Sequence, residues 1–109
     1  MGMGDGCDPT FAHVDSLLEL LTKSKSLHIL LVLDRKGIPM RFSDLKKRVT
    51  SSSTTVSRRL KELEAYGLVS RSQSPEGANA FEYSLTEDAI KLSPIMQSLF
   101  DWTAEHHND

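Results

Sequence analysis

The segment from residue 53 to residue 66 has the pattern of an amphipathic helix with an abrupt end. Its apolar residues Val56, Leu60 and Leu63 are spaced i, i+4 and i+7, which predicts a helix with one buried face. Gly67 follows and can take the left-handed backbone conformation that ends many helices. We therefore expect the helix to stop before this glycine and the chain to turn there.

Two strands are predicted directly after this helix. Residues 68–71 and 81–85 alternate apolar and polar side chains, which is typical of half-buried strands. The connection from residue 72 to residue 80 contains Pro75 and Gly77 and is longer than a tight hairpin turn. We therefore expect a pair of strands that carries a long loop.

Two helices are predicted at the start of the chain. Asp8 and Pro9 are typical of a helix start, because aspartate caps the first amides and proline is tolerated at the first helical position. A second helix is expected to begin after Ser24 or Ser26 and to stop at Gly37.

The remaining elements are predicted from short patterns. Residues 40–42 are long enough only for an edge strand, and Ser43 is expected to cap a brief helix after it. Ser52 is expected to cap the amphipathic helix. A final helix should open after Thr86, and Pro94 should bend or break it about one turn earlier, because proline removes a backbone hydrogen bond.

Length and composition predict one soluble domain. The chain has 109 residues, of which 39% are apolar and 26% charged, values usual for a single globular unit. We expect residues 1–8 to form a disordered tail and residues 9–107 to form the domain. The longest apolar stretch, residues 29–33, is far shorter than a membrane span, and the single Cys7 forms no internal disulfide. A cytoplasmic protein without membrane contact is therefore expected.

Charge is strongly segregated along the chain. The formal net charge is only -2, but between Arg41 and Arg71 eight basic residues stand against three acidic ones. This segment therefore carries +5 and the remainder of the chain -7. Such asymmetry indicates a local anion-binding surface on an otherwise acidic molecule.

The order of elements predicts an α+β, mostly helical fold: a winged helix-turn-helix with N- and C-terminal dimerisation helices. The helix at about residues 53–66 would be the recognition helix that enters the major groove of DNA. The strand pair at about residues 69–85 would be the wing. The expected function is that of a sequence-specific DNA-binding transcriptional regulator, whose partner is double-stranded DNA.

The predicted DNA contacts lie on the helix face opposite Val56. Thr54, Arg58 and Lys61 fall on that face at 100° per residue. Arg58 is the candidate for a bidentate contact with guanine, and the other cations are candidate phosphate contacts. The predicted set is Arg41, Ser43, Lys46, Lys47, Ser53, Thr54, Thr55, Ser57, Arg58, Arg59, Lys61, Arg71, Gln73 and Asn79.

Two other interpretations stay open. The cations can form an ordinary solvated helix face. Alternatively, the domain can be a winged-helix protein–protein interaction module that binds an acidic partner without binding DNA. This second interpretation predicts no salt-dependent affinity for duplex DNA.

Several motifs resemble those of a known family. They are Arg41-Phe42-Ser43-Asp44-Leu45, the run from Val56 to Arg71, Glu82-Tyr83-Ser84-Leu85-Thr86 and Leu99-Phe100-Asp101-Trp102. Together they are similar to the HxlR-type winged-helix transcription regulators, which belong near the MarR-like group. The resemblance implies a homodimer that binds a palindromic operator.

The resemblance also draws attention to the N-terminal part. An early cysteine senses oxidants in some members of the family, which would make Cys7 a possible redox residue. The chain departs from the family at Ser24-Lys25-Ser26, where Gly-Lys-Trp is usual.

Dimerisation has a physical argument of its own. The first and last predicted helices carry more apolar residues than a small domain can cover, so each can pair with its counterpart in a second copy. The alternative is that both helices wrap their own domain. The predicted interface is Phe11, Val14, Leu18, Leu21, Ile95, Met96, Leu99, Phe100 and Trp102.

The sequence contains no pattern that indicates an enzyme, a cofactor or a metal. The four histidines lack partners at the spacing of a tetrahedral metal site, and no glycine-rich phosphate loop or nucleophile elbow occurs. We therefore expect a protein without catalytic activity, and the residues identify no small-molecule effector.

Overall fold

Five helices and three strands follow one another in residues 8–77 and 80–107, the part of the chain that this computed structural model describes. The predicted redox residue Cys7 and the predicted DNA contact Asn79 lie outside the described residues. The elements are α1 (Pro9–Leu21), α2 (Ser26–Lys36), β2 (Met40–Arg41), α3 (Phe42–Val49), α4 (Ser53–Tyr66), β3 (Val69–Gln73), β4 (Phe81–Leu85) and α5 (Glu87–His106).

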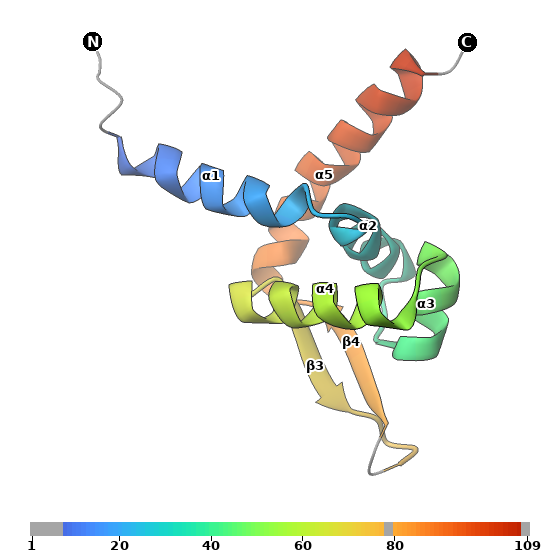
Figure 1. Cartoon of the computed structure of the whole chain (residues 1–109). Coiled ribbons are helices and arrows are strands. Elements are labelled where there is room, and N and C mark those ends of the chain that lie inside the picture. The colour runs from blue at the N-terminus through green and yellow to red at the C-terminus, as the bar shows by residue number, and fades with distance from the viewer. Residues whose placement is uncertain (1–7, 78–79, 108–109) are drawn as a thin grey trace.

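The three strands form one small antiparallel sheet in the order β2-β4-β3. Met40 pairs with Tyr83 on one side of β4, and Val69 pairs with Leu85 on the other. The short strand β2 therefore lies at the sheet edge, as predicted. Within this sheet, β3 of the β3–β4 hairpin packs against α4 (Figure 1).

The core is built around α2, which contributes Ile29, Leu30, Leu31 and Leu33. The other helices and the sheet close around it. Their buried apolar residues are Leu20, Met40, Leu45, Val49, Val56, Leu60, Leu63, Leu68, Val69, Ala89 and Met96. Burial of this set is the main force that holds the helix-turn-helix together.

The predicted helix ends are largely confirmed, because they depend on local chemistry. The side chain of Asp8 accepts a hydrogen bond from the Thr10 amide at 2.9 Å, and that of Ser52 accepts one from the Thr55 amide at 3.2 Å. Gly37 and Gly67 end α2 and α4 in the left-handed conformation, with φ of 69° and 95°.

Thr86 has a role beyond the predicted one. Its side chain caps α5 by accepting from the Ala89 amide at 3.2 Å. The same hydroxyl donates to the Gly67 carbonyl at 2.7 Å, and the Thr86 amide donates to the Leu68 carbonyl at 3.1 Å. The end of α4 is thereby joined to the start of α5.

One local prediction is wrong, and the predicted break at Pro94 is wrong as well. Ser43 does not cap α3: the helix begins at Phe42, with Arg41 in the capping position and no side-chain hydrogen bond. The reason is that β2 runs directly into α3, since Arg41 is still paired with Glu82 in the sheet.

Pro94 does not break the last helix. α5 runs without interruption from Glu87 to His106 with this proline inside it. Ala89 and Ser93 before the proline and Met96 after it are buried, so the core holds the helix on both sides of the missing hydrogen bond. Tertiary packing thus overrides a local helix breaker.

The first and last helices extend away from the body of the molecule (Figure 1). The start of α1 and the end of α5 both lie on the side away from the β3–β4 hairpin. The radius of gyration is 15.8 Å, compared with about 13 Å for a compact domain of this length. The two projecting helices account for this elongated shape.

Candidate nucleic-acid interface

Helix α4 is anchored by the three apolar residues that the sequence assigned to its inner face. Val56 and Leu63 are completely buried, and Leu60 retains 2% of its exposure. The opposite face is open to solvent: Thr54, Arg58 and Lys61 are exposed. The predicted orientation of this helix is therefore confirmed.

The exposed face of α4 borders a shallow depression of about 560 Å³. Phe42 from the start of α3 lies on one side of it, and α4 supplies the rest of the wall. The lining residues are Phe42, Ser53, Thr54, Ser57, Arg58 and Lys61. Arg58 and Lys61 form no ion pair with any residue that the structure describes, so both cations are available to an external anion.

A second group of cations lies on α3. Lys46, Lys47 and Arg48 occupy the last turn of this helix, where positive charge interacts favourably with the helix dipole. Lys47 and Arg48 are exposed and Lys46 is half-buried. Among the described residues, none of the three takes part in an ion pair. They therefore form a second cationic group, next to α4 in the chain.

Two cations that the predicted set omits belong to the same surface. Lys36 and Arg48 line a depression of about 670 Å³ that also includes Lys47. Its lining contains acidic residues too, namely Asp44, Glu76 and Glu82. Lys36 lies outside the basic segment of the sequence, and only the fold brings it next to α3. Arg48 belongs to that segment but not to the predicted set, and the structure shows that it is exposed on α3.

Arg41 is committed to a contact within the protein. Its guanidinium forms an ion pair with Glu76 in the loop of the wing and a hydrogen bond of 3.4 Å to the hydroxyl of Ser74. Ser74 is buried and also accepts from the Glu76 amide at 3.2 Å. Glu76 would therefore compete with a phosphate for Arg41, whose side chain is still 39% exposed.

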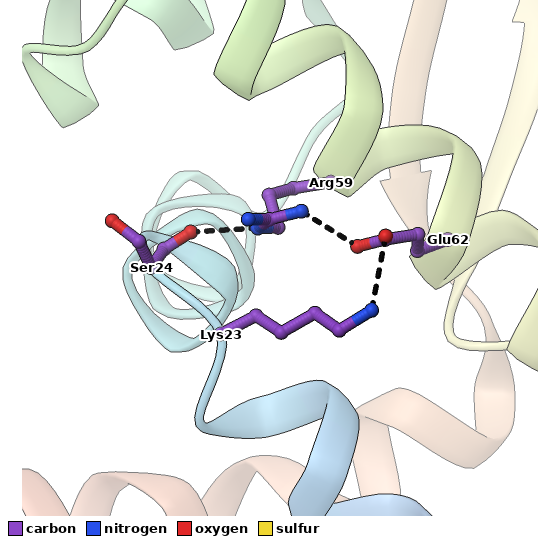
Figure 2. A network of polar contacts seen from close by, with 4 residues as sticks. All are labelled: Lys23, Ser24, Arg59 and Glu62. Atoms are coloured by element: carbon purple, nitrogen blue, oxygen red, sulfur yellow. Dashed lines mark hydrogen bonds and ion pairs between the residues drawn. The ribbon is translucent and has the colours of Figure 1, made fainter.

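Arg59 points away from the exposed face of α4. Its side chain retains 13% of its exposure, and Nη1 lies 2.9 Å from a carboxylate oxygen of Glu62. Its Nε donates to the Ser24 carbonyl at 2.9 Å (Figure 2). The two arginines that adjoin each other in the sequence, Arg58 and Arg59, therefore have separate environments.

The described part of the wing carries one cation at its base. Arg71 is 46% exposed, and its guanidinium lies 4.6 Å from the centre of the Phe81 ring. Glu64 on α4 approaches its Nε at 3.9 Å. Gln73 is exposed at the end of β3. Ser43 at the start of α3 is exposed as well, whereas Thr55 is half-buried.

The projecting helices carry large apolar side chains on their surface. Phe11 on α1 is 65% exposed, and Ile95 on α5 is 66% exposed. The other exposed members of the predicted interface are Val14, Leu18, Leu99, Phe100 and Trp102. Leu21 packs half-buried against the core, and Met96, with 2% exposure, belongs to the core itself, so these two lie apart from the exposed set.

Metal clusters and membrane-spanning helices are both absent from the described residues. No group of three or more His, Cys, Asp or Glu side chains in residues 8–77 and 80–107 is arranged to hold a metal ion. Over the same residues, no helix has both the length and the apolar character needed to cross a membrane.

The sequence from residue 20 to residue 109 matches the model of the HxlR-like helix-turn-helix proteins. The chain belongs to this family. The match covers every element from the end of α1 onward, including α3, α4 and the wing. The family resemblance drawn from the sequence motifs is confirmed.

A curated relative and a solved structure agree with this placement, and a second structure shares the fold. An uncharacterized HTH-type transcriptional regulator of Halalkalibacterium halodurans is 39% identical over 82 residues, which span 74% of this HxlR-like chain and 73% of the relative. A possible HxlR family transcriptional factor from Thermoplasma volcanium superposes with a TM-score of 0.77 at 28% identity, covering 94% of this chain and 87% of that one.

The second structure is MepR of Staphylococcus aureus in complex with DNA. It matches with a TM-score of 0.67 at 24% identity, covering 91% of this HxlR-like chain and 82% of MepR. At this identity the likeness concerns the fold alone. Together with the T. volcanium structure, it confirms the predicted winged helix-turn-helix fold.

Proposed function

We propose that this HxlR-like chain is a cytoplasmic, homodimeric regulator of transcription that binds a palindromic operator with α4 in the major groove. The observation that carries the proposal is the exposed Thr54–Arg58–Lys61 face of α4, whose two cations have no internal partner among the described residues. A free cation on an exposed helix face can contact DNA without first losing an ion pair.

Each exposed side chain is assigned a contact by its chemistry. Arg58 presents a guanidinium that can donate two parallel hydrogen bonds to the O6 and N7 atoms of guanine. Lys61 on α4 and Lys47 on α3 carry point charges suited to phosphate oxygens, which position the protein without reading sequence. Specificity should therefore depend chiefly on Arg58, and non-specific affinity on the lysines.

The apolar surface of α1 and α5 supports the homodimer. Phe11, Ile95 and Trp102 are all more than half exposed, and large apolar patches on small proteins mark interaction sites. The start of α1 and the end of α5 both lie on the side away from the wing (Figure 1), so a second copy can pair with them while α4 stays accessible. An isologous pair presents two recognition helices, which bind half-sites about 34 Å apart.

Selection of bound duplexes from a random pool tests this proposal directly. The expected product is an inverted repeat with half-site centres about 10 base pairs apart. The affinity for it should fall steeply as salt rises, because phosphate contacts release counterions. Enrichment of no sequence, with no salt-dependent binding of any duplex, would favour a winged-helix protein–protein module instead.

A matched pair of variants assigns the binding to α4. Lys61→Ala removes an exposed cation from the proposed interface, and Lys91→Ala removes an exposed cation from α5. Loss of one phosphate contact should reduce the slope of log affinity against log salt by about 0.9 for each bound Lys61. Lys91→Ala should leave that slope unchanged. Equal effects of the two changes would contradict the assigned face.

A further inference from the structure

A polar network connects the recognition helix to the turn between α1 and α2. Glu62 on α4 is its centre: one carboxylate oxygen lies 3.1 Å from the Lys23 ammonium, and the other lies 2.9 Å from Arg59. Arg59 also donates to the Ser24 carbonyl at 2.9 Å. Figure 2 shows that α4 thereby holds the turn at two points, one on a side chain and one on the backbone.

The turn has backbone hydrogen bonds of its own, from the Lys23 amide to the Leu20 carbonyl and from the Ser26 amide to the Lys23 carbonyl, but it also contains a strained residue. Lys25 occupies the capping position of α2 in the left-handed conformation, with φ of 73° and no side-chain hydrogen bond. This conformation is unfavourable for a residue with a Cβ atom and persists only where surrounding contacts impose it. The Arg59 hydrogen bond falls on the carbonyl immediately before this residue and supplies such a contact.

The attachment of α1 to the body is otherwise small. Leu20 at its end is buried, and Leu17 and Leu21 pack half-buried against the core. The side chains earlier in α1 are exposed. By contrast, α4 is fixed by three buried residues. The angle between the two helices therefore rests on one end of α1 and on the turn that the network holds.

The network lies on the same helix as the exposed face of Thr54, Arg58 and Lys61, which is called the reading face below. Glu62 follows Lys61 directly, and Arg59 follows Arg58, so each exposed cation has a neighbour that holds the turn. If the contacts of Glu62 and Arg59 with the turn change, α4 can reorient, and the direction of Arg58 and Lys61 relative to α1 changes with it. In the proposed dimer, α1 is part of the interface, so this direction determines how far apart the two reading faces lie.

We infer that Glu62 is a positioning residue that sets the orientation of the recognition helix relative to α1, and through it the half-site spacing that the dimer accepts. The inference rests on the proposed function for its second part. Its first part concerns the protein without DNA and stands on the contacts of Lys23, Ser24, Arg59 and Glu62 alone.

The spacing is tested with Glu62→Gln, which keeps the shape of the side chain and removes its charge. The probe is a series of duplexes in which the two selected half-sites are shifted by one to three base pairs. One base pair moves a half-site by about 3.4 Å, so the wild type should lose at least about tenfold in affinity at the first shift. Glu62→Gln should lose about threefold or less, because its helices can adjust.

Two further variants control this result. Glu64→Gln makes the same chemical change on the same helix but touches Arg71 rather than the turn, so overall affinity can change while the spacing preference should stay that of the wild type. Lys23→Met breaks the network from outside α4 and outside the proposed DNA contacts, so it should relax the preference as Glu62→Gln does. A stability loss alone would lower all affinities together and leave the preference intact.

Hydrogen exchange of the free protein tests the first part. The Ser26 amide donates to the Lys23 carbonyl at 3.1 Å, and the Ile29 amide donates to the Lys25 carbonyl at 2.9 Å. Both amides should exchange about fivefold faster or more in Glu62→Gln and within about twofold of wild type in Glu64→Gln.

The two measurements separate the possible failures. Unchanged exchange at Ser26 and Ile29, or an intact spacing preference in both Glu62→Gln and Lys23→Met, would overturn the inference. A wild-type protein that selects no duplex would refute the proposed function and the spacing part with it. The exchange measurement uses no DNA and would still decide whether Glu62 positions the turn.

Discussion

Helix α4 has two polar faces that differ in how their cations are used. Arg58 and Lys61 on one face are exposed and have no ion-pair partner among the described residues. Arg59 on the other face is largely buried and contacts both Glu62 and the turn before α2. Residue type and position along the chain are nearly the same, so the partners supplied by the fold decide which cation is available to DNA.

The largest expected effect is on DNA binding by the face of α4 that carries Arg58 and Lys61. Arg58→Ala should weaken binding to the selected operator by about 1 to 3 kcal/mol, or roughly 5- to 150-fold, and relax the preference at one base position per half-site. Its thermal stability should stay at the wild-type value, since the side chain makes no internal ion pair. Binding titrations on the operator and on single-base variants measure both parts. An unchanged base preference would exclude Arg58 as a reader.

A substitution on the other face of α4, at Arg59, should change the stability of the protein. Arg59→Ala leaves the Ser24 carbonyl without its donor and Glu62 with one cation fewer, which should lower the free energy of unfolding by about 1 to 3 kcal/mol. Denaturant unfolding of this variant beside Arg58→Ala measures the difference. If both variants unfold at the same denaturant concentration, the proposed division of α4 into two faces is wrong.

A buried hydroxyl beside the turn offers a gain in stability. Ser26 is completely buried, and its Oγ has no hydrogen-bond partner among the described residues. Ser26→Ala removes the orphaned oxygen and should stabilise the protein by about 1 kcal/mol, raising Tm by several degrees. Ser93→Ala is the control, because Ser93 is buried but donates to the Ala89 carbonyl at 3.1 Å. That change should lower Tm, and a fall in both variants would mean that Ser26 has a partner.

Arg41 represents an intermediate case, since it is paired but accessible. Glu76→Gln removes the carboxylate that occupies its guanidinium. The freed arginine can then take a phosphate, which should raise non-specific affinity about two- to fivefold and steepen the salt slope by about 0.9 for each bound Arg41. Titrations at several salt concentrations test this. A reduced affinity would show instead that the ion pair is needed to hold the wing in place.

The smallest expected effect is the loss of stability at acidic pH through Glu62. The hydrogen bond from Lys23 and the contacts with Arg59 hold the pKa of Glu62 below its usual range, although burial opposes them. A lowered folded-state pKa favours the ionised form, so its contribution is complete above the unfolded value of about 4.3 and is lost as the pH falls through the folded value. Wild type should therefore lose stability relative to Glu62→Gln in this range, by less than about 1 kcal/mol. A parallel pH dependence of the two proteins would contradict the assignment.

The comparison of the two faces also shows what the sequence could predict. The spacing of Val56, Leu60 and Leu63 defines the buried face of α4, and its opposite face follows from helix geometry. The caps at Asp8, Ser52 and Thr86 are predictable because the partners lie two or three residues away. Local patterns therefore sufficed for the elements and for the exposed face.

The partners of Arg41 and Arg59 could not be predicted in this way. Arg41 meets Glu76, and Arg59 meets Ser24, and each pair is separated by 35 residues in the chain. Lys36 joins the cations of α3 for the same reason, through folding rather than proximity in sequence. Met96 was predicted to lie in the dimer interface but belongs to the core. That prediction rested on apolar periodicity, which does not distinguish core positions from exposed positions on a helix that has both.

The two projecting helices have a consequence for the amount of protein that a cell must hold. In the proposed dimer, the exposed apolar residues of α1 and α5 are covered only when a second copy binds, so the fraction of protein with this surface covered depends on the protomer concentration. Dilution would expose α1 and α5 at the same time. Exposed terminal segments are preferred sites of proteolysis. Copy number would then control both the occupancy of an operator and the lifetime of the protein that occupies it.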